Sequence, residues 1–335
     1  MATEDDVLVV GGGLAGCMAA LSAAREGAQV RVVSHAESTL RTASGLIDVL
    51  GYVDAAGPLA DPFAKLGDLP PQHPYSVVGV DGIRAGLELF DDIVGEQYRG
   101  EHTDRNALIP THGGTVKPTA RYPVSVAPGV ASSITDTLLV GFQTLPDFDA
   151  PLAARHLTAA GVPFETSGVT ISFPGGLRTE ATAVQYATVL DTNEEITVVG
   201  RPVPVRQALA DAVKPHIDSA ERVGFPAVLG HTDTEAIRAA LTSHLGAEVF
   251  EVPMGPPSLP GKRLETCLHN AMAEAGVHIS TGNPIVGFNA NGGQIEQVLM
   301  ERTHQEIPYT ADQYILATGG LVGGGVDSER TQVYE

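Results

Sequence analysis

The spacing of hydrophobic and polar positions changes period twice at the start of the chain. Residues 7–10 are four consecutive aliphatic side chains, which is typical of a short buried strand. Leu14, Met18 and Leu21 then recur at helical spacing, a glycine follows where a helix would end, and residues 30–33 are mostly valine. The pattern predicts a strand, a helix and a second strand, which is a β-α-β unit.

A glycine motif joins the first predicted strand to the helix. Gly11, Gly13 and Gly16 have the spacing G-x-G-x-x-G, and Leu14 and Ala15 lie in the first helical turn. The first glycine permits a tight turn, the second lets the backbone approach a pyrophosphate, and the third lets helix and strand pack closely. The free N–H groups and the positive dipole end of the helix would face the phosphates. The motif therefore predicts a phosphate site for a flavin or a dinucleotide.

The second predicted strand ends on Ser34, where an Asp or Glu that binds the adenosine ribose is usual. Ser34 is short and uncharged, and His35 follows it. Glu37 lies three residues further on and could reach back, although its spacing is poor. The phosphate half of the motif is thus intact and the adenosine half is weakened. This favours a flavin over a nicotinamide dinucleotide, and FMN slightly over FAD.

The same periodicities predict further elements along the chain. Residues 54–75 are rich in proline and glycine and are expected to be irregular. A second α/β region is expected to begin near Ala183, and a turn at residues 291–293 is expected to make a hairpin. We predict helices at 82–94, 150–160, 206–217, 234–245 and 262–275, and strands at 138–142, 226–229, 248–252, 277–280, 285–288 and 294–301.

Residues 314–320 form a second strand that ends in glycines. Thr318, Gly319 and Gly320 follow its apolar residues. In two-lobed flavoproteins such a strand returns the chain to the nucleotide domain, and its tip abuts the cofactor. Together with the first glycine motif, it favours a flavin.

These patterns predict the α/β fold class and a division into lobes. We expect a Rossmann-like flavin-binding domain built from residues 1–53 and 261–335. Residues 54–260 are expected to be an inserted α/β domain that meets a substrate or a partner protein. A chain of 335 residues exceeds the usual size of a single domain, which agrees with this division.

Charge narrows the possible partners and surroundings. The net charge is −20, with 40 acidic and 20 basic residues, of which only four are lysines. Nucleic-acid binding is not expected, because it needs a basic face. An acidic, lysine-poor surface is typical of a protein that works in a halophilic cytosol, where salt screens its self-repulsion.

Two further features bear on location and metals. No apolar run approaches the ~18 residues of a membrane-spanning helix, and the acidic residues 1–6 do not resemble a signal peptide, so a cytoplasmic protein is expected. The chain has two cysteines, Cys17 and Cys267, and no C-x-x-C pair. We therefore expect no metal or iron–sulfur site in this chain. Cys17 is predicted to be a small buried side chain on the packed face of the first helix.

A series of blocks, in order along most of the chain, resembles a known family. They are residues 11–16 (GGGLAG), 44–50 (SGLIDVL), 73–76 (HPYS), 114–119 (GTVKPT), 256–264 (PPSLPGKRL) and 317–320 (ATGG), the last followed by glycines at 323–325. Together they resemble the B subunit of the anaerobic, quinone-linked glycerol-3-phosphate dehydrogenase, within the two-lobed flavoprotein oxidoreductases. The glycine blocks are widespread among flavoproteins, whereas the others are more specific.

The resemblance implies a flavin-dependent enzyme that works in a complex. It would oxidise sn-glycerol 3-phosphate to dihydroxyacetone phosphate and pass electrons to quinone. The implied partners are a flavin-bearing A subunit and an iron–sulfur C subunit, which would hold this chain at the inner face of the cell membrane without insertion of its own. In the family, the B subunit is usually assigned FMN.

Two alternatives and one departure accompany this interpretation. The chain could instead be a non-catalytic scaffold or electron conduit of the same complex, or a free-standing flavin oxidoreductase for another small organic acid. The family continues beyond the strand at 314–320, so a chain that stops at Glu335 looks truncated. On this basis we expect it to bind flavin weakly.

Oxidation of a secondary alcohol by a flavin requires a base for the hydroxyl proton and a path for hydride. His73 and His112 are candidate bases, because both lie in Gly/Pro-rich segments expected to line a cleft. Ser44 and Gly45 are expected to place a hydroxyl or a backbone N–H beside the flavin.

The phosphate of the substrate requires cations. Lys117, Arg121, Lys262 and Arg263 are candidates, since clustered basic residues are unusual in so acidic a chain. Arg is suited to bidentate contacts with oxyanions. The predicted catalytic set is therefore His73, His112, Lys117 and Arg263.

Overall fold

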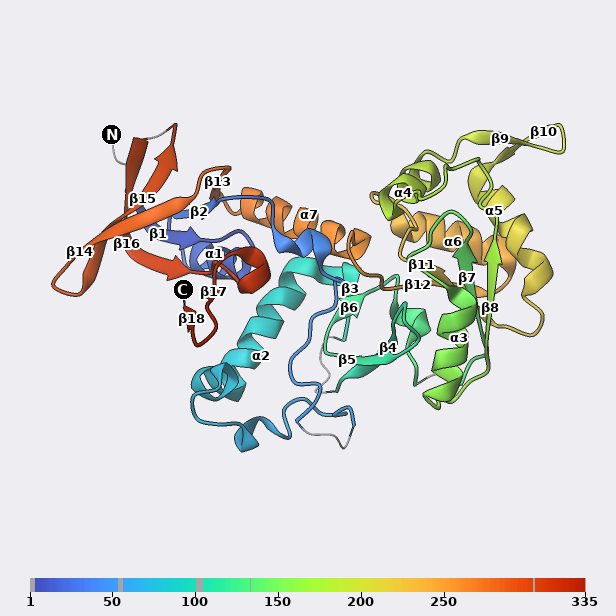
Figure 1. Ribbon diagram of the computed structural model, residues 1–335, viewed down its shortest axis with the longest axis horizontal. Helices are drawn as coiled ribbons and strands as arrows, with labels where there is room; N and C mark the ends of the chain where they lie inside the picture. Colours follow the sequence, from blue (N-terminus) through green and yellow to red (C-terminus); the bar gives the residue numbers. More distant parts are fainter. Residues whose placement is uncertain (1–3, 54–56, 101–104, 133, 304, 335) are drawn as a thin grey trace. The chain divides into compact units, whose positions relative to one another are not determined.

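The computed structural model describes residues 4–53, 57–100, 105–132, 134–303 and 305–334 (Figure 1). Its helices are α1 (Leu14–Arg25), α2 (Pro74–Val94), α3 (Ala150–Ala159), α4 (Ala183–Thr192), α5 (Val205–Val213), α6 (Thr234–Leu245) and α7 (Leu259–Glu274). The short strands are β3 (Tyr98–Arg99), β4 (Ala107–Pro110), β5 (Val116–Thr119), β6 (Tyr122–Pro123), β9 (Glu195–Val198), β10 (Arg201–Pro204), β17 (Asp327–Ser328) and β18 (Val333–Tyr334). The strands of the two main sheets are given below.

The described chain divides into two compact units. The first unit consists of Met1–Arg41, Ala85–Val94 and Leu264–Glu335, and the second of Thr42–Arg84 and Gly95–Arg263. The expected boundaries were after residues 53 and 260. Residues 42–53 belong to the second unit because Ile47 pairs with Arg121 there.

The first unit is built on a mixed sheet with strand order β13-β2-β1-β16-β15-β14. Its strands are β1 (Glu4–Val10), β2 (Val30–Ser34), β13 (His278–Thr281), β14 (Ile285–Asn291), β15 (Gln294–Arg302) and β16 (Gln305–Leu316). The four strands β13, β2, β1 and β16 run parallel to one another. Strand β15 pairs antiparallel with both β16 and β14. The predicted β-α-β unit is confirmed, because β1 pairs with β2 and α1 connects them (Figure 1).

Packing in the first unit follows from the apolar strands. Leu8 and Val33 are fully buried in the sheet. Cys17 has an exposed fraction of 0%, which confirms its predicted place on the packed face of α1. The predicted hairpin at residues 291–293 is also confirmed, since it joins β14 to β15.

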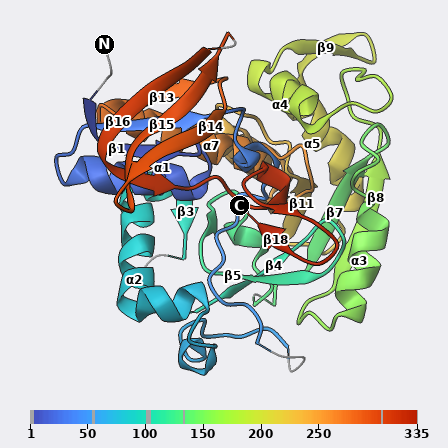
Figure 2. The ribbon, with the colours of Figure 1, turned by 60° about the vertical axis from the view of Figure 1, so that its left-hand side comes forward.

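The second unit contains a parallel sheet with strand order β12-β11-β7-β8. Its strands are β7 (Thr137–Phe142), β8 (Thr166–Ile171), β11 (Arg222–Pro226) and β12 (Glu248–Val252). Helix α3 lies alongside β8 (Figure 2). The prediction of α/β class is therefore correct for both units. The α/β part of the second unit begins at β7, earlier than the predicted start near Ala183.

One predicted strand lies several residues from its place in the structure. Residues 226–229 were expected as a strand, whereas β11 begins at Arg222. A charged residue interrupts the apolar run that predicts a buried strand, so the start of β11 was missed. Arg222 is buried because it donates to Thr137 Oγ1 at 2.6 Å and to the Pro128 carbonyl at 2.8 Å. Its guanidinium also lies over the Phe164 ring, 4.4 Å from the centroid.

Other predicted elements agree with the structure or differ at their ends. Helix α6 and strand β12 have the predicted bounds. Helix α7 begins three residues earlier than predicted, and α2 begins at Pro74, inside the stretch expected to be irregular, with a kink at Gly79. Among the described helices, none is long and apolar enough to cross a membrane.

Candidate functional site

Two glycines of the first motif are fixed by close packing within the first unit. Gly11 has a φ of +118°, and a Cβ at this position would lie 2.0 Å from the Ala317 carbonyl oxygen. A Cβ on Gly16 would lie 1.9 Å from the Gly11 carbonyl oxygen. These positions fit the predicted roles of the first and third glycines in a tight turn and in close helix–strand packing.

The second glycine has open space beside it. Gly13 is the N-cap of α1, and a Cβ there would meet no atom within 4 Å. The first turn of α1, which starts at Leu14 and Ala15, contains no acidic residue. An anionic group can therefore approach the free N–H groups and positive end of the helix. The start of α1 therefore fits a pyrophosphate.

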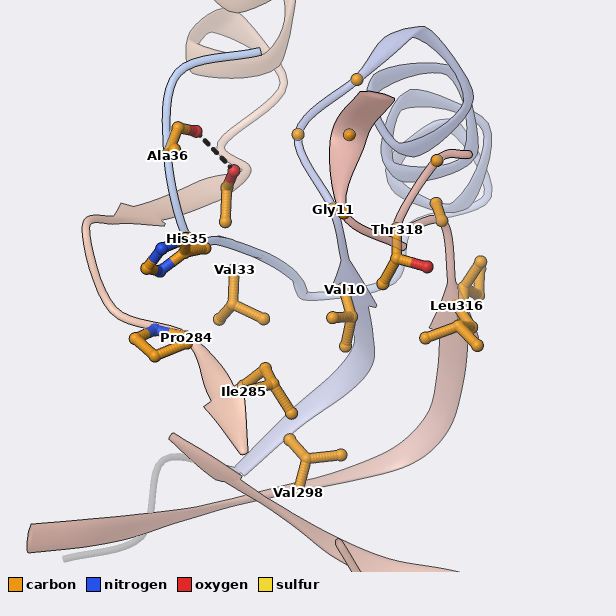
Figure 3. A pocket seen from close by; sticks show the side chains of 18 of the residues that line it. Val10, Gly11, Val33, His35, Ala36, Pro284, Ile285, Val298, Leu316 and Thr318 are labelled. Atoms are coloured by element: carbon orange, nitrogen blue, oxygen red, sulfur yellow. Dashed lines mark hydrogen bonds between the residues drawn. The ribbon is translucent and has the colours of Figure 1, made fainter. Parts of the chain in front are cut away.

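A cavity of about 700 Å³ opens at the carboxyl ends of β1, β2 and β16. Val10, Val33, Ile285 and Val298 surround it (Figure 3). Cavities of this size, mostly apolar with a few polar groups, are usual for cofactors. It is lined by residues 10–13, 33–39, 283–285, 287, 288, 295, 298, 314–319, 323 and 324. The carboxyl ends of parallel strands are where α/β sheets bind ligands.

The second glycine-ended strand reaches the same cavity. The backbone N–H of Ala317 donates to the Val10 carbonyl at 2.8 Å, so β16 continues beside β1 to its end. Thr318 and Gly319 line the cavity, and Gly319 has a φ of +83°. Gly320 begins the next turn, where its carbonyl accepts the Gly323 N–H at 3.0 Å. The structure thus brings both glycine motifs to one cavity.

Ser34 also lines this cavity, at the end of β2. A Cβ on Gly12 would lie 3.2 Å from the Ser34 Cβ, so the serine packs closely against the glycine turn. The Ser34 hydroxyl donates to the Ala36 carbonyl at 2.8 Å (Figure 3). The hydroxyl proton of Ser34 is therefore donated within the turn and not to a ligand. Glu37, whose spacing in the sequence looked poor, lines the cavity as well.

Ser44 and Gly45 lie in the second unit. Gly45 has a φ of +76°, and a Cβ there would lie 2.7 Å from the Pro260 Cβ. Its carbonyl accepts a hydrogen bond from the Tyr98 hydroxyl at 2.8 Å. Contact of these two residues with a flavin stays a prediction.

Two of the predicted catalytic residues, His73 and Lys117, lie in the second unit and have separate partners. The Lys117 ammonium lies 2.5 Å from Asp48 Oδ2. The Tyr75 hydroxyl donates to the Val49 carbonyl at 2.9 Å, and His73 Nδ1 accepts the Tyr75 backbone N–H at 3.1 Å. Burial, and to a lesser degree the charge of Asp48, raises the pKa of Tyr75 above its ordinary value. His73 thus contacts Tyr75, whereas Lys117 pairs with Asp48.

Arg263 is held inside the second unit. Its Nη1 lies 2.6 Å from Glu251 Oε2, the Glu251 side chain is fully buried, and the Gly230 carbonyl accepts two further bonds from the guanidinium. Arg121 is buried and donates to the Ala120 carbonyl at 3.0 Å. These contacts account for both arginines within the fold, and their binding of a phosphate stays a prediction.

His112 is exposed, and its backbone N–H donates to the Pro253 carbonyl at 3.2 Å. Another histidine, His231, which the sequence pattern did not mark, lies in the segment between β11 and α6. Among the described residues its Nδ1 is buried without a hydrogen-bond partner. Burial, followed by the charges of Lys262 and Arg263, lowers the pKa of His231. A single histidine outside any motif does not indicate in the sequence that a nitrogen of its ring will be buried near two cations. In the part of the chain that the structure describes, no group of three metal-binding side chains comes together.

Comparison with known families gives a match over nearly the whole chain. The model of the FAD binding domain family matches residues 6–335. Among solved structures, a 3-ketosteroid Δ1-dehydrogenase from Sterolibacterium denitrificans is 15% identical with a TM-score of 0.42, and the match covers 95% of this chain and 48% of that one.

Two curated relatives are named as B subunits of the same enzyme. A probable B subunit of anaerobic glycerol-3-phosphate dehydrogenase from Halobacterium salinarum is 56% identical over 336 residues, covering 100% of this chain and 78% of the relative. The B subunit of anaerobic glycerol-3-phosphate dehydrogenase from Vibrio cholerae is 28% identical over 346 residues, covering 98% of this chain and 76% of the relative. This agrees with the resemblance carried by the sequence blocks.

Proposed function

Because this chain belongs to the FAD binding domain family and, within it, to the family of B subunits of anaerobic glycerol-3-phosphate dehydrogenase, we propose that it oxidises sn-glycerol 3-phosphate to dihydroxyacetone phosphate. The observation that carries the proposal is the cavity of the first unit. There an open Gly13 at the start of α1 faces a space that Thr318 and Gly319 also line. Such a cavity fits a flavin pyrophosphate.

We propose FAD as the flavin. The family model describes an FAD binding domain, and it gives no support to the FMN preference drawn from Ser34. The cavity also extends from the glycine turn past Ser34 to Ile285 and Val298. An adenosine group needs such a space beyond the pyrophosphate, whereas FMN ends at its single phosphate. The apolar side chains would pack against the adenine, and Gly11–Gly13 with α1 would hold the pyrophosphate.

When bound, the flavin would supply the acceptor for the hydride that leaves carbon 2 of the substrate. The substrate hydroxyl must also lose a proton, which His73 or His112 of the second unit would take. Lys117 would hold the substrate phosphate by its charge, with Asp48 fixing the position of the ammonium. The cationic residues Lys262 and Arg263 are further candidates for this phosphate.

A second candidate function is electron transfer without substrate turnover, as a conduit or scaffold in the complex. It is favoured by the fact that two of the predicted phosphate ligands are already paired, Lys117 with Asp48 and Arg263 with Glu251. In that case the oxidation would take place in a partner chain. A free-standing oxidoreductase for another organic acid receives no support from the relatives, which are named as parts of a larger enzyme.

We propose that the partners are a flavin-bearing A subunit and an iron–sulfur C subunit at the membrane. The naming of the relatives as B subunits supports a complex with other chains. An iron–sulfur chain would carry electrons from the flavin towards quinone one at a time. The chain would then lie at the inner face of the membrane through these partners.

Anaerobic reduction of the flavin tests the proposal. The protein is reconstituted with FAD, and glycerol 3-phosphate is added while the absorbance band near about 450 nm is followed. Bleaching of the isolated chain supports catalysis in this chain itself, and bleaching only in the presence of the partner chains supports a conduit. A chain that binds no flavin contradicts both the catalytic and the electron-conduit function. If the isolated chain is active, His73→Gln and His112→Gln identify the base, with the exposed His216→Gln as the matched control from the same unit.

A further inference from the structure

The cofactor cavity lacks a carboxylate at the place where related folds have one. Strand β2 ends on Ser34, whose hydroxyl proton is given to the Ala36 carbonyl. An adenosine ribose bound here would have hydroxyl groups to donate, and an acidic side chain is the usual acceptor. One acidic residue is present among the described residues that line this cavity. Within the described lining residues it is Glu37, with an exposed side-chain fraction of 74%.

The turn after β2 explains how Glu37 reaches the cavity in spite of its spacing. The Ser34 hydroxyl bond to Ala36 folds the chain back directly after the strand. The Ser38 hydroxyl then accepts the Leu40 backbone N–H at 3.0 Å, and a short 3₁₀ helix, η1 (Thr39–Thr42), follows. Glu37 therefore lies within a compact turn rather than further out along an extended chain.

A chain of charges fixes the Glu37 carboxylate. Arg41 Nη1 lies 2.5 Å from Glu37 Oε1, and Arg41 Nε lies 2.5 Å from Glu265 Oε2. The Glu265 side chain is 4% exposed, so the series begins at a buried anion on α7 and ends at the exposed carboxylate of Glu37, a residue of the cavity lining. The bond to Glu265 is the main cause that raises the pKa of Arg41, and Glu37 adds to it. Arg41 is thus a fixed cation between two carboxylates.

We propose that Glu37 is the acceptor for the ribose hydroxyls of the adenosine group of FAD, in place of an acid at the end of β2. Arg41 and Glu265 are positioning residues that hold its carboxylate at the cavity. This inference rests on the proposed FAD-dependent function. It assigns the choice of FAD over FMN to one side chain, because FMN has no adenosine ribose for Glu37 to bind.

Equilibrium titrations with FAD and with FMN test the assignment. The variant Glu37→Gln removes the charge but keeps the shape, and Glu26→Gln, an exposed glutamate at the other end of α1, is the matched control. We expect Glu37→Gln to weaken FAD binding about tenfold or more, the range for a hydrogen bond to a charged group, and to leave FMN binding unchanged. Glu26→Gln should change neither affinity. Equal weakening of FAD and FMN, or no weakening of FAD, overturns the inference.

An FAD analogue with 2′-deoxyadenosine separates a direct bond from a structural effect. The wild-type chain should bind the analogue about tenfold more weakly than FAD, whereas Glu37→Gln should bind the two with nearly equal affinity. Glu265→Gln should lower the FAD affinity by a smaller factor, again without an effect on FMN, because it loosens Arg41. The affinity lost on replacing FAD by the analogue is then compared between the two proteins. If the loss is as large in Glu37→Gln as in the wild type, Glu37 does not bind the 2′-hydroxyl and the inference is wrong.

The proposed function and the role of Glu37 fail in different ways. A wild-type chain that binds neither FAD nor FMN overturns the proposed function and the inference with it. A wild-type chain that binds FAD while Glu37→Gln binds it equally well overturns the inference alone.

Discussion

Gly11 lies so close to Ala317 that a Cβ on the glycine would stand 2.0 Å from the alanine carbonyl oxygen. The two residues are far apart in the sequence, yet β1 and β16 are neighbours in one sheet. Gly13 lies two residues further along, and a Cβ on it would meet no atom within 4 Å. Neighbouring glycines of one motif therefore serve different purposes, one for folding and one for the ligand.

Substitutions at these two glycines should have different outcomes. Gly13→Val should fold with an unchanged thermal unfolding midpoint, because its φ of −78° suits a side chain and the space is empty. It should nevertheless lose flavin binding, since the valine would occupy the approach of the pyrophosphate. Circular dichroism and FAD titration measure the two properties.

Gly11→Ala should instead destabilise the first unit by several kcal/mol, on the order of a severe core clash at a positive φ. The expected result is a large drop in unfolding midpoint, whatever the flavin concentration. A Gly13→Val protein that binds FAD with wild-type affinity would show that the pyrophosphate lies elsewhere.

The Arg263–Glu251 pair should prove important for stability. Glu251→Gln leaves the mostly buried guanidinium of Arg263 without its anionic partner. We expect a loss of about 2 to 4 kcal/mol in the free energy of unfolding, less than for a wholly buried pair because Arg263 is partly exposed. Glu235→Gln is the control, since the Glu235 carboxylate that pairs with Arg238 is 48% exposed, and its loss should cost less than ~0.5 kcal/mol. Urea unfolding measures both, and equal costs would contradict the assignment.

The buried thiol of Cys17 should make stability fall at alkaline pH. Burial, helped by the charge of Glu265, raises the pKa of Cys17 to about 11. The unfolded thiol loses its proton near its ordinary pKa of about 9, so between these values the unfolded state binds fewer protons than the native state. This stabilisation is complete below pH ~9 and is lost as the pH rises to about 11, by roughly 2 to 3 kcal/mol in total.

The measurement is the difference between the wild type and Cys17→Ala in urea unfolding at several pH values from about 8 to about 11. Subtraction removes the titration of other groups, which both proteins share. The difference should shrink or change sign as the pH rises. A constant difference would show that the thiol is not buried in solution.

The net charge of −20 should make the protein depend on salt. The screening length falls from about 10 Å at 0.1 M to about 3 Å at 1 M, which removes most of the repulsion between surface carboxylates. We expect the thermal unfolding midpoint to rise by at least ~5 °C between about 0.1 M and about 2 M KCl. Sucrose at matched osmolality is the control for effects unrelated to charge. A midpoint that does not change with KCl would contradict a halophilic adaptation.

The first β-α-β elements of the first unit could be predicted from the sequence because the patterns that define them are local. The strand, the glycine turn and the helix follow one another in the chain, so period and spacing were sufficient. The same holds for α6 and β12, whose predicted bounds agree with the structure. Strand β11 was misplaced because its first residue is Arg222. Tertiary partners, among them Thr137 and Phe164, satisfy the buried arginine there, and no local pattern reveals them.

The far side of the cofactor cavity could not be predicted from the sequence. Ile285 and Val298 reach it through the pairing of β14 with β15 and of β15 with β16, which no local pattern reveals. Glu37 was discounted because a count of residues assumes an extended chain, whereas the Ser34 hydroxyl folds it back. The ion pair between Lys117 and Asp48, which are far apart in the sequence, likewise appeared only in the structure.

The pairing of β1 with β16 also determines when the first unit can be completed during synthesis. Roughly 300 residues separate the two strands, so at about 5–20 residues per second the ribosome needs about 15 to 60 s to make β16 after β1. The β7–β12 sheet of the second unit is already complete by then. Throughout this interval β1, with its apolar Leu8 and Val9, has one edge that no strand of its own chain can cover. The nascent protein is therefore most exposed to aggregation through its earliest strand, and slow translation lengthens that exposure.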